Sequence, residues 1–232
     1  MGIRVLAAGA TESTLRGTVG VFERESGETV QLSFGAVGLL RDQIQAGEAA
    51  DLAIVTPAII EQLEAKALVE VRTRVALGRL GGGIAVPAGA TRPVVERPED
   101  LRRALLDAQE IYYADPATAT AGAHLLRVAD RLEIGAAVRQ KGRTAAGGRA
   151  AMQAMALSTA KAVGLAQISE ILSVPEVTLV GPYPEDLQVL TTYSGVLLTG
   201  TRSPEAAQAF LRFLVGPLVQ GRLQQAGFLP AL

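Results

Sequence analysis

The first third of the chain alternates short apolar runs with amphipathic stretches, and no other feature constrains the fold as strongly. Apolar runs at Ile3–Ala7, Thr29–Phe34 and Asp51–Val55 have the length and composition of strands. The stretches that follow them carry apolar residues at helical spacing, and two of these stretches stop at Gly27 and Gly47. Strands that alternate with helices in this way form mostly parallel sheets with helical crossovers. The chain is therefore predicted to be an α/β protein.

A second region of the same kind follows the glycines at 81–83, which suit either a bend between two domains or a plain loop. Helices are expected at 98–106, 120–132 and 148–157, and strands at 110–114, 162–166, 177–180 and 187–199. The tail returns to a helix with an apolar face that needs a sheet to cover it. We expect residues 1–80 plus 198–232 to form lobe I, and residues 81–197 to form lobe II, with two crossover segments as the hinge.

Composition removes several classes of function. The chain of 232 residues has 22 Lys and Arg against 23 Asp and Glu, so it lacks the excess positive charge of a nucleic-acid binder. It has no cysteine and one histidine, His124, so no metal site is expected. Neither a P-loop nor a G-x-G-x-x-G fingerprint is present, so no cofactor is expected. The expected partner is a small molecule rather than a nucleic acid.

No apolar run is long enough to span a bilayer, so membrane insertion is not expected. The amino terminus also lacks a basic segment followed by an apolar one. The protein is expected to be periplasmic if a signal peptide has been removed, and cytoplasmic otherwise. We expect it to be a monomer.

Three loops share one design, in which the carboxyl end of a strand leads through small residues into a helix. They span 8–13, 33–38 and 115–122. A helix amino terminus offers unpaired N–H groups and a partial positive charge, which suit an anion. The alternative is that these loops are ordinary turns of an α/β fold. The candidate ligand-binding residues in these loops are Ala10, Thr11, Ala36, Val37, Gly38, Thr118, Thr120, Ala121 and Gly122.

Several of these segments resemble the periplasmic molybdate-binding proteins of ABC importers. The resemblance lies in Ala7–Thr11, Leu32–Gly35 and, most specifically, Ile44–Leu52. It continues in Ala114–Pro116 with Ala121–Gly122, in Ala162–Leu165, and in the closing segments Phe210–Pro217 and Gly227–Phe228. The resemblance implies a two-lobed type II periplasmic-binding fold, with the ligand in the cleft between the lobes. It further implies a small anionic ligand and an ABC importer permease as partner.

The chain departs from that family at the ligand site. The family binds tetrahedral oxyanions with serine hydroxyls from the first two loops and a tyrosine after a late strand. Here Ala10 stands at the first serine position, the loop 35–38 has no hydroxyl, and Gln167 stands at the tyrosine position. A buried anion needs compensating donors. The departures therefore favour a carboxylate-bearing anion over molybdate.

Replacement donors are available near the later loops. Arg143 and Arg149 flank a small-residue loop, and either guanidinium could bind a carboxylate in bidentate fashion, although both could equally be surface residues. Gln167 could donate an amide hydrogen bond or cap the helix that follows it.

A second hypothesis makes the protein an enzyme on the same scaffold. Relatives of the molybdate-binding proteins include isomerases of tricarboxylic acids that act without a cofactor, as aconitate isomerase does. Glu12 and His124 would then be the catalytic residues that move the proton. The alternatives are that Glu12 stabilises a helix dipole and that His124 is a half-exposed helix residue.

Overall fold

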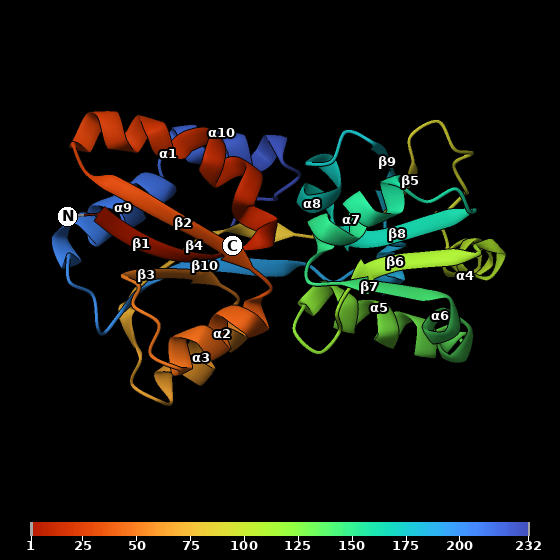
Figure 1. The fold of residues 1–232 in the computed structure, drawn as a ribbon, viewed down its shortest axis with the longest axis horizontal. Coiled ribbons are helices and arrows are strands. Elements are labelled where there is room, and N and C mark those ends of the chain that lie inside the picture. Colours follow the sequence, from red (N-terminus) through yellow and green to blue (C-terminus); the bar gives the residue numbers. More distant parts are fainter. Residues whose placement is uncertain (1, 232) are drawn as a thin grey trace. The chain divides into compact units, whose positions relative to one another are not determined.

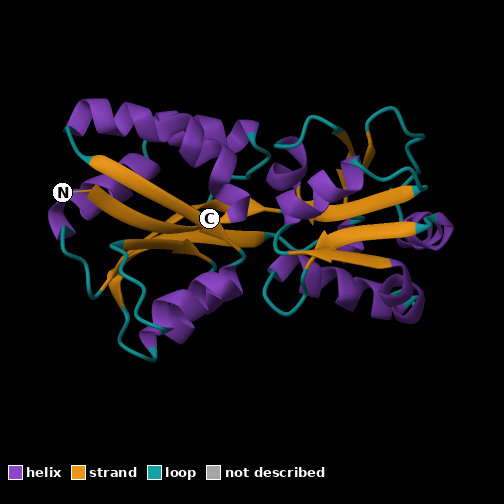
Figure 2. Cartoon of the chain, in the orientation of Figure 1, coloured by secondary structure: helices purple, strands orange, loops and turns teal. Residues whose placement is uncertain are grey.

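The computed structural model describes residues 2–231, which form two compact units. Unit 1 comprises the chain up to Leu80 together with the part that starts at Thr191, and unit 2 is Gly81–Leu190. Figure 1 shows the elements of each unit, and Figure 2 separates helices from strands. The sequence placed the return to the first unit at residue 198. Because strand β10 (Thr191–Leu198) pairs with strands of unit 1, the return falls at its start instead.

Unit 1 is built on a five-stranded sheet with the strand order β2-β1-β3-β10-β4. Its other strands are β1 (Gly2–Ala8), β2 (Thr29–Gly35), β3 (Leu52–Val55) and β4 (Val69–Leu80). Its helices are η1 (Gly9–Thr11), α1 (Glu12–Ser26), α2 (Val37–Gln45), α3 (Pro57–Glu64), α9 (Pro204–Leu214) and α10 (Pro217–Gln225). Strand β10 pairs antiparallel with β3 and β4, so it runs against the other four strands.

Helices cover both faces of the unit 1 sheet (Figure 1). Helices α1, α9 and α10 lie on one face, and α2 and α3 lie on the other. The predicted apolar face of the tail helix is buried through Phe210, whose ring meets that of Phe22 edge-on at 4.9 Å. These contacts connect the amino-terminal and carboxyl-terminal parts of unit 1.

Unit 2 repeats this plan with the strand order β7-β6-β8-β5-β9. Its strands are β5 (Gly82–Pro87), β6 (Glu110–Ala114), β7 (Gly142–Ala145), β8 (Ala162–Gln167) and β9 (Val177–Pro182). Its helices are α4 (Pro98–Asp107), α5 (Thr120–Arg131), α6 (Gly135–Lys141), α7 (Gly148–Ala156), α8 (Ile168–Leu172) and η2 (Glu185–Leu187). Here β5 is the strand that runs against the other four.

The sheet of unit 2 separates two hydrophobic clusters. Because successive side chains of a strand point to opposite faces, neighbours such as Tyr112 and Tyr113 belong to different clusters. The cluster that contains Tyr113 includes Leu125 of α5, and the cluster that contains Tyr112 includes Met152 of α7. Both faces of the sheet are therefore buried under helices, as expected for an α/β unit.

The glycines at 81–83 are explained by close packing. Gly82 and Gly83 are the first two residues of β5. The three glycines therefore do not form a plain loop, which was one of the two alternatives that the sequence allowed. A methyl group on Gly82 would lie 2.6 Å from the Tyr183 ring, and one on Gly81 would lie 2.8 Å from the Gln188 amide. A side chain at Gly82 would have to displace the buried Tyr183 ring, whereas at Gly81 only the end of the flexible Gln188 side chain would have to move.

Other differences from the sequence predictions are local. The expected strand at 187–199 begins at Thr191, because 185–187 form a 3₁₀ turn and Gln188 turns its amide onto the Gly82 backbone. Helix α6 and strand β7 were not predicted, and β7 has only four residues, which give little periodicity to detect. Among residues 2–231, no helix combines the length and apolar character that crossing a membrane requires.

Candidate functional site

In unit 1, the parallel strands bring three helix starts to one edge of the sheet. Ala8 pairs with Gly35 at the ends of β1 and β2, and Ala7 pairs with Ile54 near the end of β3. Helices α1, α2 and α3 follow these strand ends. The first two of the predicted ligand loops therefore lie at the same edge, which is where α/β sheets commonly bind ligands.

The first loop is a short 3₁₀ turn whose one side-chain hydroxyl is already engaged in a hydrogen bond. The Thr11 hydroxyl donates a 2.8 Å hydrogen bond to the carbonyl oxygen of Ala8, and both Thr11 and Ala10 are buried. Glu12 begins α1, and its carboxylate accepts a 2.8 Å hydrogen bond from Nε of Arg16. This loop can therefore offer a ligand backbone N–H groups more readily than a threonine hydroxyl.

The second loop has the same character. Ala36 occupies the N-cap position of α2 and makes no side-chain cap, so the first-turn N–H groups receive no side-chain acceptor from that residue. Val37 and Gly38 are buried within the first turn of the helix. Only backbone recognition is available from these three residues.

In unit 2, the ends of the parallel strands again gather helix starts at one edge. Ala114 pairs with Ala145, and Tyr113 pairs with Leu165, so β6, β7 and β8 end together. Helix α5 follows β6, α7 follows β7 and α8 follows β8. The third predicted loop and the small-residue loop before α7 are thus neighbours at this edge.

The loop after β6 is held by Asp115. Its backbone N–H donates to the carbonyl oxygen of Ala145, and its carboxylate accepts a 2.9 Å hydrogen bond from the N–H of Ala117. A side chain on Gly122 would overlap the carbonyl oxygen of Ala114, so glycine allows the first turn of α5 to pack against the strand end. The predicted donors Thr118 and Thr120 are half-buried near Ala121 in this region.

The starts of α7 and α8 meet at Glu170. Its carboxylate accepts a 3.2 Å hydrogen bond from the N–H of Gln167, and a side chain on Gly148 would overlap the same carboxylate. Gln167 is buried at the N-cap position of α8. Arg149 follows Gly148 in the first turn of α7 and is half-buried. This edge therefore combines a buried acid with a neighbouring arginine.

Arg143 lies apart from this group. Its Nε donates a 3.3 Å hydrogen bond to Glu110, the first residue of β6, and its side chain is half exposed. The Glu110 carboxylate also accepts hydrogen bonds from the hydroxyls of Ser158 and Tyr112. These hydroxyl bonds lower the pKa of Glu110. The structure brings Arg143 to this cluster rather than to the helix starts.

His124 makes a structural contact on the side of α5. Its Nε2 lies 2.9 Å from the carbonyl oxygen of Leu187, so the N–H donates there, and its ring meets Tyr183 edge-on at 5.3 Å. Burial lowers the pKa of His124, which the bond to Leu187 offsets only in part. The histidine is therefore neutral near pH 7, and its Nε2 proton is already committed to a carbonyl.

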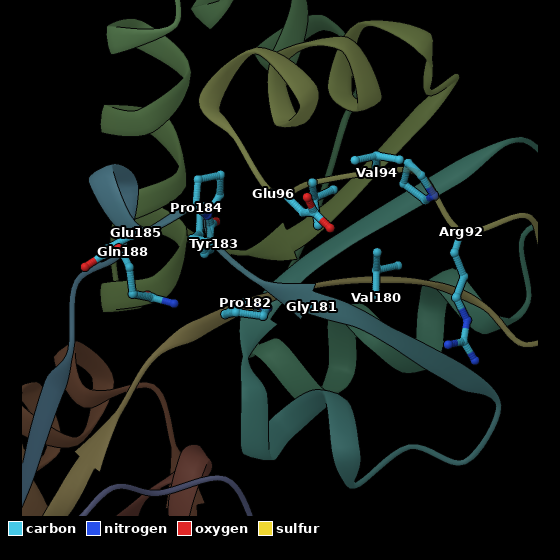
Figure 3. Close-up of a pocket in the computed structure, with 12 residues that line it drawn as sticks. Arg92, Val94, Glu96, Val180, Gly181, Pro182, Tyr183, Pro184, Glu185 and Gln188 are labelled. Atoms are coloured by element: carbon cyan, nitrogen blue, oxygen red, sulfur yellow. The ribbon is translucent and has the colours of Figure 1, made fainter.

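Three pockets lie within single units and contain none of the predicted ligand residues. The pocket in Figure 3 has a volume of about 690 Å³ and lies beside β9, with Val95 and Tyr183 among its lining residues. A second pocket in unit 2 is lined by Asp107 and Lys161, and one in unit 1 by Arg4 and Asp51. No group of three or more metal-ligating side chains occurs within residues 2–231.

Sequence reasoning missed two charged groups at these edges. Glu170 follows Gln167 by three residues, and this capping-box spacing would have identified it. Arg16 follows Glu12 by four residues, which is the spacing of a helical ion pair. The contact of Arg16 with the Phe34 ring joins two distant segments, and no local pattern reveals it.

The fold and these edges define a class of solute-binding proteins. Residues 3–229 match the family described as bacterial extracellular solute-binding proteins. The chain belongs to this family.

The comparisons with individual proteins agree with this assignment. The chain is 27% identical to an aconitate isomerase from a Pseudomonas species, over 98% of this chain and 87% of that protein. Among solved structures, it is similar to the periplasmic molybdate-binding protein of Azotobacter vinelandii, with a TM-score of 0.83, 18% identity and 99% and 100% coverage of the two chains. It also matches the sulfate-binding protein SubI of Mycobacterium tuberculosis H37Rv, with a TM-score of 0.78, 19% identity and coverage of 100% and 87%. The predicted type II periplasmic-binding fold is confirmed.

Proposed function

We propose that this solute-binding protein captures a small carboxylate-bearing anion for an ABC importer. The observation that carries the proposal is the absence of side-chain caps at helix starts near the strand ends. The N-cap residues Thr11, Ala36, Ala119 and Gly147 make no side-chain cap on the helices they precede. First-turn N–H groups without such caps are suited to bind an anion.

Each unit has its own set of proposed contacts. In unit 1 they are backbone N–H groups of Ala10–Thr11 and of Ala36–Gly38. In unit 2 they are the loop Thr118–Gly122, including the Thr118 and Thr120 hydroxyls, and the Arg149 guanidinium. Gln167 contributes by holding the start of α8 in place.

The carboxylate preference follows from the supply of donors. A tetrahedral oxyanion in a dehydrated site needs many hydrogen bonds to replace water. The Thr11 hydroxyl already donates to Ala8, and Ala36, Val37 and Gly38 carry no hydroxyl. An arginine can bind a planar carboxylate with two parallel hydrogen bonds, which fits Arg149 to this ligand class. Arg143 is the weaker choice, because it contacts Glu110 at the start of β6, away from the helix starts.

The family supports a place outside the cytoplasmic membrane and delivery of the ligand to an ABC importer permease. In this proposal the protein acts as a monomer. The function needs no cofactor.

Ligand binding is tested by thermal shift followed by calorimetry. The panel contains trans-aconitate, cis-aconitate, citrate and malate as carboxylates, and molybdate, tungstate and sulfate as inorganic oxyanions. A ligand at 100 times its dissociation constant stabilises the folded protein by roughly 2.7 kcal/mol. We expect stabilisation by at least one carboxylate and weak or undetectable binding of molybdate. Sub-micromolar molybdate binding would refute the carboxylate assignment.

A second candidate function is isomerisation of an unsaturated tricarboxylate. The similarity to an aconitate isomerase over 98% of the chain favours it. His124 is poorly suited to move the proton, because its Nε2–H donates to Leu187. Glu12 would then be the base, and Arg16 is the group that donates to it. Incubation with cis- and trans-aconitate in D₂O distinguishes the two functions, since an isomerase exchanges substrate protons and a binding protein does not.

A further inference from the structure

We propose that Arg16 determines anion affinity by neutralising Glu12 at the start of α1. This inference rests on the proposed function and assigns Arg16 as a residue that sets the affinity for anions. Its role is electrostatic, and it requires no direct bond between Arg16 and the ligand.

The geometry begins with a helical pair. Glu12 and Arg16 are four residues apart on α1, and Nε of Arg16 lies 2.8 Å from Oε1 of Glu12. Side chains on a helix lean toward its amino terminus, so Arg16 reaches back over the first turn. The guanidinium therefore lies at the same end of α1 as the proposed ligand contacts.

A second contact fixes the guanidinium from the neighbouring strand. Its Cζ lies 4.9 Å from the centre of the Phe34 ring, within the range of a cation–π interaction. Phe34 is the penultimate residue of β2, beside Gly35, where the second loop begins. Arg16 thus connects α1 with the end of β2, at the edge that carries both unit 1 loops.

The two charges differ in their access to water. The Glu12 side chain is 18% exposed, whereas that of Arg16 is 59% exposed. A mostly buried carboxylate is poorly screened by solvent. Its negative charge repels an anion that approaches the first turn of α1. Arg16 offsets this repulsion and leaves the helix start attractive to anions.

This arrangement predicts opposite effects for the two members of the pair. Arg16→Gln leaves Glu12 without this cation, and a dianion or trianion should bind about 5- to 10-fold more weakly at low salt. Glu12→Gln leaves a net positive pair, and the same anion should bind more tightly by a similar factor. The double variant removes both charges and should return within about 3-fold of the parent.

The matched control lies on the same helix. Arg24 is exposed near the end of α1, and Arg24→Gln changes the net charge by the same amount as Arg16→Gln. Eight residues of helix place it about 12 Å further along the axis. Arg24→Gln should therefore leave the affinity within about 2-fold of the parent in 0.15 M salt, where the screening length is about 8 Å.

The experiment is calorimetry of the five proteins with trans-aconitate, and with molybdate as a second anion, at about 0.02 M, 0.15 M and 0.5 M salt. Circular dichroism verifies the fold of each variant. We expect Glu12→Gln to bind the anion most tightly and Arg16→Gln to bind it most weakly, with the parent and the double variant between them. These differences in affinity should shrink at high salt. A purely structural role would weaken binding in both single variants and would not respond to salt.

The outcomes separate the two proposals. If the parent binds an anion and Arg16→Gln binds it equally well, the role of Arg16 is refuted and the proposed function stands. If Glu12→Gln loses binding, the role of Arg16 is also refuted, because Glu12 then contributes to affinity. If the parent binds neither trans-aconitate nor molybdate, the same variants are measured with whichever other carboxylate of the panel it binds, and if it binds none, both proposals fail. Both proposals are supported if the parent binds an anion and the variants follow the predicted order of affinity.

Discussion

The side-chain amide of Gln188 forms two hydrogen bonds with the backbone of Gly82. Its Oε1 accepts from the Gly82 N–H at 3.0 Å, and its Nε2 donates to the Gly82 carbonyl oxygen at 2.9 Å. The chain enters unit 2 just before Gly82 and leaves it just after Gln188. Leu80 pairs with Thr191 in unit 1, so the two passages of the chain also lie side by side there. The Gln188 bonds thus add to the backbone pairing at the start of β5, where the Gly82 carbonyl oxygen also accepts a 3.2 Å hydrogen bond from the Tyr183 N–H.

Replacing Gln188 should destabilise the protein. Gln188→Leu keeps the size of the side chain but leaves the Gly82 backbone without this partner, and we expect a loss of about 1–3 kcal/mol in the free energy of unfolding. Urea denaturation measures this change. The control is Gln224→Leu, at an exposed position of α10, which should change the free energy by less than about 0.5 kcal/mol. Equal stability of both variants would contradict the contribution assigned to these bonds.

A methyl group at Gly148 should be far more damaging than one at Gly147. At Gly148 it would overlap the Glu170 carboxylate and lie 2.9 Å from Cβ of Ala166. At Gly147 it would meet nothing within 4 Å, and the φ of −164° is ordinary extended backbone. We expect Gly148→Ala to lower the free energy of unfolding by about 1–3 kcal/mol.

The same pair of variants bears on the site. Because Gly148 allows the first turn of α7 to approach Glu170, Gly148→Ala should also weaken carboxylate binding, whereas Gly147→Ala should not. Thermal denaturation with and without ligand measures both effects. Equal stability and affinity of the two variants would show that the close approach at Gly148 is not required.

His124 should make stability depend on pH in a defined window. Burial lowers its pKa in the folded state, so the unfolded chain takes up the proton first as the pH falls. The stabilisation is fully present above the unfolded pKa of about 6.5 and declines as the pH falls below it. Because the chain has one histidine, His124→Gln should remove this slope between about pH 6.5 and 5. Urea titrations across that window test it, and an unchanged slope would contradict it.

Much of the architecture could be predicted from the sequence because local patterns determine it. The alternation of strands and helices predicted the α/β class, and the apolar face at Ala207, Phe210 and Leu214 predicted a helix that packs on a sheet. The role of Gly82 could not be predicted, because the Tyr183 ring that excludes a methyl group there is distant in sequence.

The candidate site was less predictable for the same reason. The loop positions follow from strand ends, so Ala10–Thr11 and Thr118–Gly122 could be named in advance. The partners of charged side chains depend on tertiary contacts. Arg143 and Arg149 flank the same loop in sequence, yet Arg143 binds Glu110 at the start of β6, whereas Arg149 lies in the first turn of α7.

The most direct measurement of the central claim is calorimetry of the parent, Arg149→Ala and Arg143→Ala with molybdate and with the carboxylate that gives the largest thermal shift. We predict that the parent prefers the carboxylate and that Arg149→Ala weakens this binding by roughly 2–5 kcal/mol, because a buried carboxylate loses its cation. Arg143→Ala should bind within about 0.5 kcal/mol of the parent, as expected for an exposed ion pair. Tighter binding of molybdate, or carboxylate affinity unchanged in both variants, would contradict the account.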